Sequence, residues 1–589
     1  MDIHVSRQRW AVASTAFAVL LGGGWTASGD PPDEATTTFY DRLHVPLVNV
    51  EVIATDREGV PIRDLAADDF EILEDGLPVE VTHFSAPSIA EAPSVSGGVE
   101  RPFPDIRDRD VYLVLYFDDL NVNPRVRRSA LARLRSFVSQ PLPPGVKAFV
   151  VRFDGRLKIE CEPTERSEDL LAALDRVGMQ TPMDHTREGE ALVRSMQSNA
   201  LGSVQLGASD LNVDPVAEAG FDLAKNQINS DFLPLIRHYA TQEYHRNRAS
   251  LQGLSNFVLY LQGIHGRKAV LWLGSVETRV GENLFRTYRE LFPGQARTVS
   301  LSPMMDSMGY DLTGELRDLT RFANSHRVSF YPLGSLGAGV AVSFDYDNRI
   351  LESGQPGSTG PVDLRAEADA LNVMSESTGG RTLLDSRLDL DLSQVSGDLN
   401  ASYSLAYRPP TPDDGKYHRI AVKVKREGVV VRHRQGYEMM DDGGRLAART
   451  VSAAMLGVVD NPLGITVGFR DHEPRDDGLF LVPVTVEISI GDLVLVPEGE
   501  QHVARISVAS VVRDDEGRLS EVHEREYPIT IANDQLIASV AERATFVIGM
   551  VLREGPHRIT VSVRDDYSAI ESIGFVDVVA GADVGFLPG

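Results

Sequence analysis

The sequence predicts a multidomain protein in which a central doubly wound α/β domain is flanked by β-rich units and followed by a C-terminal β-sandwich. An apolar run at residues 111–117 is typical of a strand that is buried on both faces of a parallel sheet. Strand-like and helix-like segments then alternate as far as residue 395, whereas short strands alone recur from residue 453 onward. The 589 residues leave room for about three to four domains.

Residues 1–29 have the layout of a secretory signal peptide. Arg7 and Arg9 precede an apolar stretch at residues 10–21, and the small residues Ala27-Ser28-Gly29 follow it. Since a bilayer span needs ~20 apolar residues, we expect cleavage rather than anchoring. The mature chain has no other apolar segment of that length. We therefore expect an exported protein that is periplasmic, on the outer surface or extracellular.

The composition excludes two classes of site. The formal net charge of −27 argues against a nucleic acid partner, because phosphate binding needs clustered Lys and Arg. Cys161 is the single cysteine, so an intrachain disulfide and a Cys-rich metal site are both excluded. We interpret Cys161 as a small hydrophobic residue at the end of a strand rather than as a nucleophile.

Two segments on either side of the α/β region have the alternation of strands. Val48, Val50 and Val52 alternate with polar residues, and we expect a small β unit at residues 44–85. A similar alternation leads us to expect a β extension at residues 400–440.

The α/β domain is predicted at residues 110–395. Its predicted strands are 111–117, 146–153, a return strand at 157–161, 268–273 and 328–333, and its predicted helices are 125–140, 167–177, 238–264, 314–325 and 364–377. Residues 181–236 are polar and weakly periodic, so we interpret them as an insertion with some helix. The long crossovers favour a mostly parallel sheet covered by helices.

The C-terminal segment, residues 453–589, is predicted to be an Ig-like β-sandwich. Its short strands are separated by turn sequences at residues 475–478, 514–517 and 553–555, each of which contains acidic residues and a glycine.

The loop Asp118-Asp119-Leu120-Asn121-Val122-Asn123 follows the first buried strand and is the predicted site. In a doubly wound sheet, ligands bind outside the carboxyl ends of the strands, which is where this loop would lie.

Several short stretches in residues 44–437 resemble one protein family. They are Asp68-Asp69-Phe70 with Leu73-Glu74-Asp75-Gly76, Gly266-Arg267-Lys268-Ala269-Val270, Arg327-Val328-Ser329-Phe330-Tyr331-Pro332, Thr378-Gly379-Gly380-Arg381, and Tyr403-Ser404-Leu405-Ala406-Tyr407 with Gly436-Tyr437. In order and spacing they resemble the VWFA-related (von Willebrand factor type A-like) family of exported bacterial proteins. The resemblance implies a Rossmann-like fold and an extracytoplasmic location, and it supplies no reaction. Residues after 437 lie outside it.

Domains of this type usually hold a divalent cation on an Asp-x-Ser-x-Ser loop, the metal-ion-dependent adhesion site (MIDAS). Counted from Asp118, both Ser positions are apolar here; counted from Asp119, they are Asn121 and Asn123, whose carbonyl oxygens could coordinate. The later strand that carries an Asp in the family is followed here by Ser275, which could act through water. These five residues are the candidate ligands of a degenerate MIDAS for Mg²⁺ or another divalent cation.

A metal-free interpretation of the same loop stays open. In it, Asp118 caps or turns the loop and Asn121 tolerates a left-handed backbone. Because Mg²⁺ rarely accepts a depleted oxygen shell, this interpretation is the favoured one.

We expect a non-enzymatic binding or adhesion-like protein whose partner is a protein or a cell-envelope ligand. If the loop binds metal, an acidic group of the ligand would complete the metal shell. The alternatives are a structural envelope component without a ligand and an unrecognised hydrolase. The sequence offers no paired catalytic constellation in support of the hydrolase.

Overall fold

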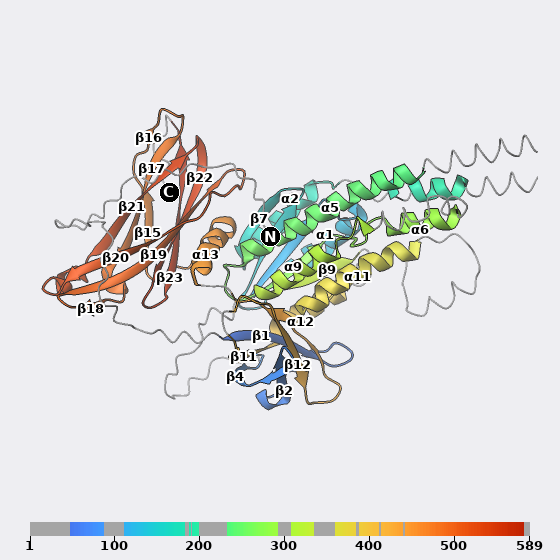
Figure 1. Ribbon diagram of the computed structural model, residues 1–589, viewed down its shortest axis with the longest axis horizontal. Coiled ribbons are helices and arrows are strands. Elements are labelled where there is room, and N and C mark those ends of the chain that lie inside the picture. The colour runs from blue at the N-terminus through green and yellow to red at the C-terminus, as the bar shows by residue number, and fades with distance from the viewer. Residues whose placement is uncertain are drawn as a thin grey trace, which may run out of the picture. The chain divides into compact units, whose positions relative to one another are not determined.

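The computed structural model describes residues 47–87, 111–182, 188–189, 191–199, 232–292, 308–334, 360–384, 388–411, 414–439 and 442–581 (Figure 1). The predicted signal peptide and most of the predicted insertion lie outside these residues. The chain divides into two compact units, the first containing Pro46–Val258 and His265–Met439 and the second containing Met440–Gly589. None of the described helices is long and apolar enough to cross a membrane.

The first unit contains the predicted, mostly parallel sheet. Its six strands lie in the order β10 (Leu383–Leu384), β9 (Val328–Gly334), β8 (Arg267–Leu273), β5 (Val111–Asp118), β6 (Val146–Phe153) and β7 (Leu157–Thr164). Neighbouring strands are parallel except β6 and β7, which are antiparallel. The short turn at Asp154-Gly155 permits only this antiparallel return, because a parallel neighbour needs a long crossover.

Helices lie on both faces of this sheet (Figure 1). Leu113, Leu115 and Phe117 alternate along β5 and pack in one core with α1 (Pro124–Val138), α2 (Ser167–Met179) and α12 (Leu388–Asn400). On the other face, the ring of Tyr116 lies 5.3 Å from that of Phe257 in α5 (Phe232–Leu261). Helix α6 (Glu282–Leu291) packs against the start of α5. Helices α9 (Thr313–Ser325) and α11 (Gly360–Thr378) contact β9.

The domain extends beyond its predicted end at residue 395, because α12 continues to Asn400. Leu388, Leu392, Val395 and Leu399 are buried and have helical spacing. Between them lie Asp, Ser and Gly residues that disfavour a helix interior, so packing on the sheet, rather than intrinsic propensity, stabilises α12.

The predicted β unit and β extension form one structural unit. One sheet has the order β13 (Val430–Arg432), β1 (Val48–Thr55), β11 (Ser402–Tyr407) and β4 (Val81–Ser85), and the other has β14 (Gly436–Tyr437), β12 (His418–Val424), β2 (Phe70–Glu74) and β3 (Leu77–Val79). Both sheets are antiparallel and share one hydrophobic core. The two segments are therefore not separate modules, since each supplies strands that the other needs for pairing.

The second unit consists of two antiparallel sheets around one core, with α13 (Asp442–Leu456) packed on β19 and β22. The first sheet contains β15 (Thr466–Phe469), β16 (Glu473–Pro474), β17 (Phe480–Ser489) and β21 (Arg543–Leu552), and the second contains β18 (Val496–Glu498), β19 (Gln501–Asp514), β20 (His523–Ala532), β22 (Gly555–Asp565) and β23 (Glu571–Ala580). Gly478 and Gly517 have φ of 76° and 79° in two of the predicted turns, a conformation that favours glycine.

Candidate functional site

The loop that follows β5 lies where the direction of winding of the sheet reverses. From β5, the chain adds β6 on one side and β8 on the other. Phe117 is in register with Leu273, so Asp118, the last residue of β5, and Ser275, two residues after β8, both lie at the carboxyl edge of the sheet. Ser275 is half-buried there. This edge is the position at which doubly wound sheets bind ligands.

Asp118 is fully buried and turns the loop. Its Oδ1 accepts a hydrogen bond from the Leu120 amide at 3.2 Å, and its carbonyl oxygen accepts from the amides of Asn121 at 3.2 Å and Val122 at 2.9 Å. The turning role in the metal-free interpretation is therefore present. The second carboxyl oxygen, Oδ2, is buried and has no hydrogen-bond partner among the described residues.

Burial raises the pKa of Asp118 to about 7. The Ser250 hydroxyl and the amides of Leu120 and Asn121 oppose this rise, whereas the neighbouring Asp119 adds to it. The carboxyl group therefore changes its protonation state close to neutral pH.

Asp119 is held by an arginine in a bidentate ion pair. Arg127 donates from Nε to Oδ1 at 2.8 Å and from Nη2 to Oδ2 at 3.1 Å. Nη1 of Arg152 lies 3.7 Å from the same Oδ2. Burial raises the pKa of Asp119, and the pairing with Arg127 opposes that rise. Both carboxyl oxygens of Asp119 therefore face guanidinium groups.

Arg127 also ties the loop to the end of α2. It donates to the carbonyl oxygens of Val177 at 2.9 Å and Gln180 at 3.1 Å. Carbonyl groups at a helix C-terminus lack partners within the helix and attract cations. One buried side chain thus connects α1, the loop after β5 and α2.

Asn121 is fixed by two side chains of α5. Its Oδ1 accepts from Nε of Arg246 at 3.0 Å, and its Nδ2 donates to Oγ of Ser250 at 3.0 Å. Arg246 also pairs with Glu243 one turn away. Non-glycine residues with positive φ are Asp75, Arg327 and Ala569 among those described, so Asn121 does not adopt the left-handed backbone that it was expected to tolerate. The side-chain contacts with α5 hold this residue in an ordinary conformation.

Asn123 is the N-cap of α1. Its Oδ1 accepts from the Arg125 amide at 2.9 Å, and Pro124 occupies the first helical position, which suits its fixed φ and missing N–H. Capping, which the metal-free interpretation assigned to Asp118, thus belongs to Asn123.

The donor set of this loop does not suit a divalent cation. The side-chain oxygens of Asp119, Asn121 and Asn123 all accept hydrogen bonds from protein N–H groups, and two of these groups are arginine side chains. Oδ2 of Asp118 is one carboxylate oxygen, whereas Mg²⁺ requires octahedral oxygen coordination. The arginines supply positive charge to the loop in place of an ion.

Arg127, Arg152, Arg246 and Ser250 were not predicted as site residues. Arg127 lies on α1 next to Val126, and both residues are buried. The spacing between Asp119 and Arg127 matches no known sequence motif, so the ion pair could not be predicted from it. Arg246 and Ser250 are more than 120 residues from the loop in sequence. Only the packing of α5 on the sheet brings them to it.

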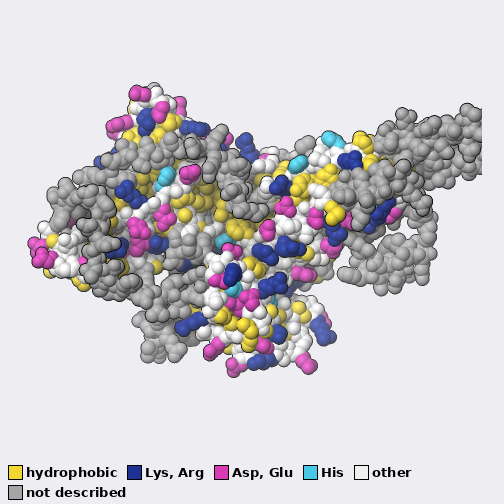
Figure 2. Space-filling model, in the orientation of Figure 1, with side chains coloured by type: hydrophobic (Ala, Val, Ile, Leu, Met, Phe, Trp, Pro, Cys, Tyr) yellow, Lys and Arg dark blue, Asp and Glu magenta, His cyan; other side chains and the backbone are white. Residues whose placement is uncertain are grey.

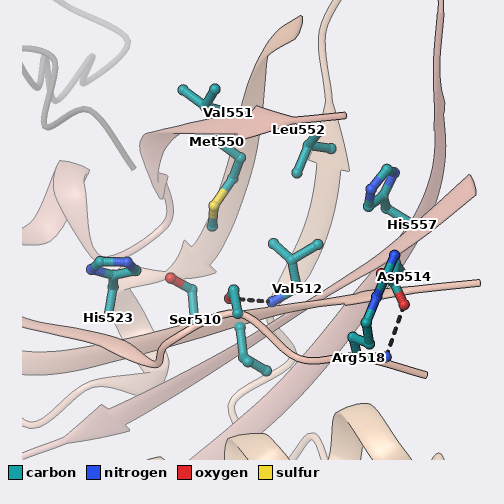
Figure 3. A pocket seen from close by; sticks show the side chains of 11 residues that line it. Ser510, Val512, Asp514, Arg518, His523, Met550, Val551, Leu552 and His557 are labelled. Atoms are coloured by element: carbon teal, nitrogen blue, oxygen red, sulfur yellow. Dashed lines mark hydrogen bonds and ion pairs between the residues drawn. The ribbon is translucent and has the colours of Figure 1, made fainter. Parts of the chain in front are cut away.

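The second unit has a small cavity between its two sheets, and serines, histidines and an aspartate line it (Figure 3). Ser510 and His523 are cross-strand partners there, but among the described residues no hydrogen bond joins them. Asp514 pairs with Arg518 at 2.7 Å rather than orienting a histidine. At about 20 Å³ the cavity has room for about one water molecule. It therefore offers neither an activated serine nor space for a substrate.

Comparisons with known protein families and with curated proteins find no match. Among solved structures, a β-glucuronidase from Bacteroides uniformis is similar over 32% of this chain and 20% of that chain, with 9% identity and a TM-score of 0.14. This chain thus spans about a fifth of that enzyme. Three N-terminal domains of the type V pili tip protein Mfa5 from Porphyromonas gingivalis are similar over 90% of this chain and 76% of that chain, with 7% identity and a TM-score of 0.21. Both similarities are weak.

Proposed function

We propose that this chain is an exported, non-enzymatic binding protein. Its VWFA-like domain holds a protein or cell-envelope ligand at the carboxyl edge of β5 and β8, and its second unit is an Ig-like β-sandwich. The observation that carries the proposal is the loop at residues 118–123, which lies at the switch point of the sheet and is braced by Arg127 of α1 and Arg246 of α5. Such bracing supports binding, because a preformed loop loses little conformational freedom when a ligand docks.

The surface around the loop provides a test that leaves the buried network intact. Arg125 is exposed at the start of α1, and Arg408 is exposed elsewhere in the first unit. We expect Arg125→Glu to weaken saturable binding of the immobilised protein to envelope fractions by about tenfold, on the order of 1.4 kcal/mol. Arg408→Glu is the matched control and should bind as the unsubstituted chain does. Equal binding by both variants and the parent would place the ligand elsewhere.

Metal dependence is tested separately by thermal melting. An ion that binds the folded state raises Tm through linkage. Because the loop oxygens accept hydrogen bonds from the protein, we expect saturating Mg²⁺ or Ca²⁺ to leave Tm unchanged. A rise in Tm that disappears in Asp118→Ala would contradict this expectation and establish the metal-dependent form of the proposal.

A further inference from the structure

A second group of potential ligands lies in the β unit, away from the loop after β5. Glu74, Asp75 and His418 each offer one donor atom, and the three atoms lie within 4.8 Å of one another. Glu74 ends β2, Asp75 follows it in the turn to β3, and His418 begins β12. Strands β2 and β12 are antiparallel neighbours, and Ile420 is in register with Glu74. Strand pairing thus joins residues that are more than 340 positions apart.

The histidine presents one ring nitrogen to both carboxyl groups. Nδ1 of His418 lies 2.8 Å from Oδ2 of Asp75 and 3.8 Å from Oε1 of Glu74. Ligands bound to one Zn²⁺ at about 2.0–2.2 Å each lie at comparable separations from one another. Small side-chain movements would therefore bring all three donors onto one ion.

Outer partners already orient two of these side chains. Nε2 of His418 lies 3.0 Å from Oδ1 of Asp414, and the Tyr437 hydroxyl donates to Oε2 of Glu74 at 3.0 Å. A histidine that binds metal through one nitrogen usually donates its other N–H to a carboxylate or carbonyl, which fixes the ring. Asp414 and Tyr437 supply this kind of support and leave Nδ1 and Oε1 directed toward the centre of the group.

Two tyrosine hydroxyls surround the buried end of the group. The side chain of Tyr407 is fully buried, and its hydroxyl lies next to the carboxylate of Glu74 and the hydroxyl of Tyr437. These neighbours help to hold Glu74 in place. The side chain of Asp75 is half exposed, whereas that of Glu74 is 3% exposed. Solvent therefore reaches the group from the Asp75 side.

We propose that Glu74, Asp75 and His418 bind a divalent transition metal ion of the Zn²⁺ class, with a fourth position open to water. One imidazole and two carboxylates suit Zn²⁺, and three protein ligands with an open position are common for this ion. Binding replaces the proton that Nδ1 shares with Asp75, and that proton is released to solvent. The ion links the β2–β3 turn to β12, and so fastens the segment before the α/β domain to the segment after it.

The test is a Zn²⁺ titration of the full chain after treatment with a chelator, with Co²⁺ absorption as a second readout of coordination. We expect one tight equivalent in the parent chain and the loss of that equivalent in His418→Gln and Asp75→Asn. Asp75→Asn is at a half-exposed turn and guards against a folding defect in the first variant. Asp414→Asn should keep the stoichiometry and weaken affinity by about tenfold to a hundredfold, because it removes only the partner that orients the ring.

His83→Gln is the control, because His83 is an exposed histidine in β4 of the same unit. It should bind Zn²⁺ as the parent does. The proposal is overturned if the parent chain binds no stoichiometric Zn²⁺, in which case the group is an ion-pair network with a charged His418. It is also overturned if both ligand variants bind as tightly as His83→Gln.

Discussion

Replacing Arg127 by Met is expected to lower the free energy of unfolding of the α/β domain by about 3–5 kcal/mol. The change leaves Asp119 as a buried carboxylate without its bidentate partner, since the side chains of Arg127 and Asp119 are only 4% and 5% exposed. It also removes the donors to the carbonyl oxygens of Val177 and Gln180. Trp272 provides the measurement, because it is fully buried in β8 and is the single Trp among the described residues. Urea unfolding of a chain that lacks residues 1–29, followed by Trp fluorescence, therefore reports on this domain.

Two further variants separate the ion pair from general damage to α1. Arg128→Met changes an exposed neighbour on the same helix and should shift stability by no more than about 0.5 kcal/mol. Asp119→Asn combined with Arg127→Met removes the buried unpaired charge, so the double variant should recover part of the loss. A loss below about 1 kcal/mol in Arg127→Met would show that Arg152 alone compensates Asp119 and that the bracing of the loop is weak.

The parts of the fold that could be predicted depend on local patterns. The continuous apolar run of β5 identified a strand inside a parallel sheet, and the short turn after Phe153 identified the return strand β7. Pairing between distant segments leaves no such pattern. Nothing near Val50 indicates that its partner is Leu405, and so one β unit was expected as two.

In the candidate site, too, local features could be predicted and contacts between distant segments could not. Its position followed from the end of β5, and the turning role of Asp118 and the helix start at Pro124 are local features. The hydrogen bonds that occupy the side chain of Asn121 could not be predicted, because their partners, Arg246 and Ser250, lie on α5, which is distant in sequence. Residue types suggested ligands for a cation, whereas the tertiary contacts supply arginine N–H groups to the same oxygens.

Asp118→Asn is expected to change how stability depends on pH. Burial raises the pKa of Asp118 to about 7, against an ordinary value near 3.8, so the folded state holds this proton more tightly than the unfolded state. The stabilising contribution of the protonated carboxyl is fully present below about pH 3.8 and is lost as pH rises toward 7. At about 1.36 kcal/mol for each unit of pKa difference, the loss is at most about 4 kcal/mol. Asparagine has a similar shape and no titrating proton, so the variant lacks this slope.

The measurement compares urea unfolding at several values between pH 4 and pH 8. The stability of Asp118→Asn relative to the parent should increase across this interval and level off above pH 7, because Asp118 is then ionised in both states. Asp318→Asn, which alters an exposed carboxyl group on α9, is the control and should follow the parent. Parallel profiles for the parent and Asp118→Asn would mean that Oδ2 is solvated or bound in the folded protein. The orphaned oxygen would then have a partner, and a ligand or ion at this loop would again be the simplest explanation.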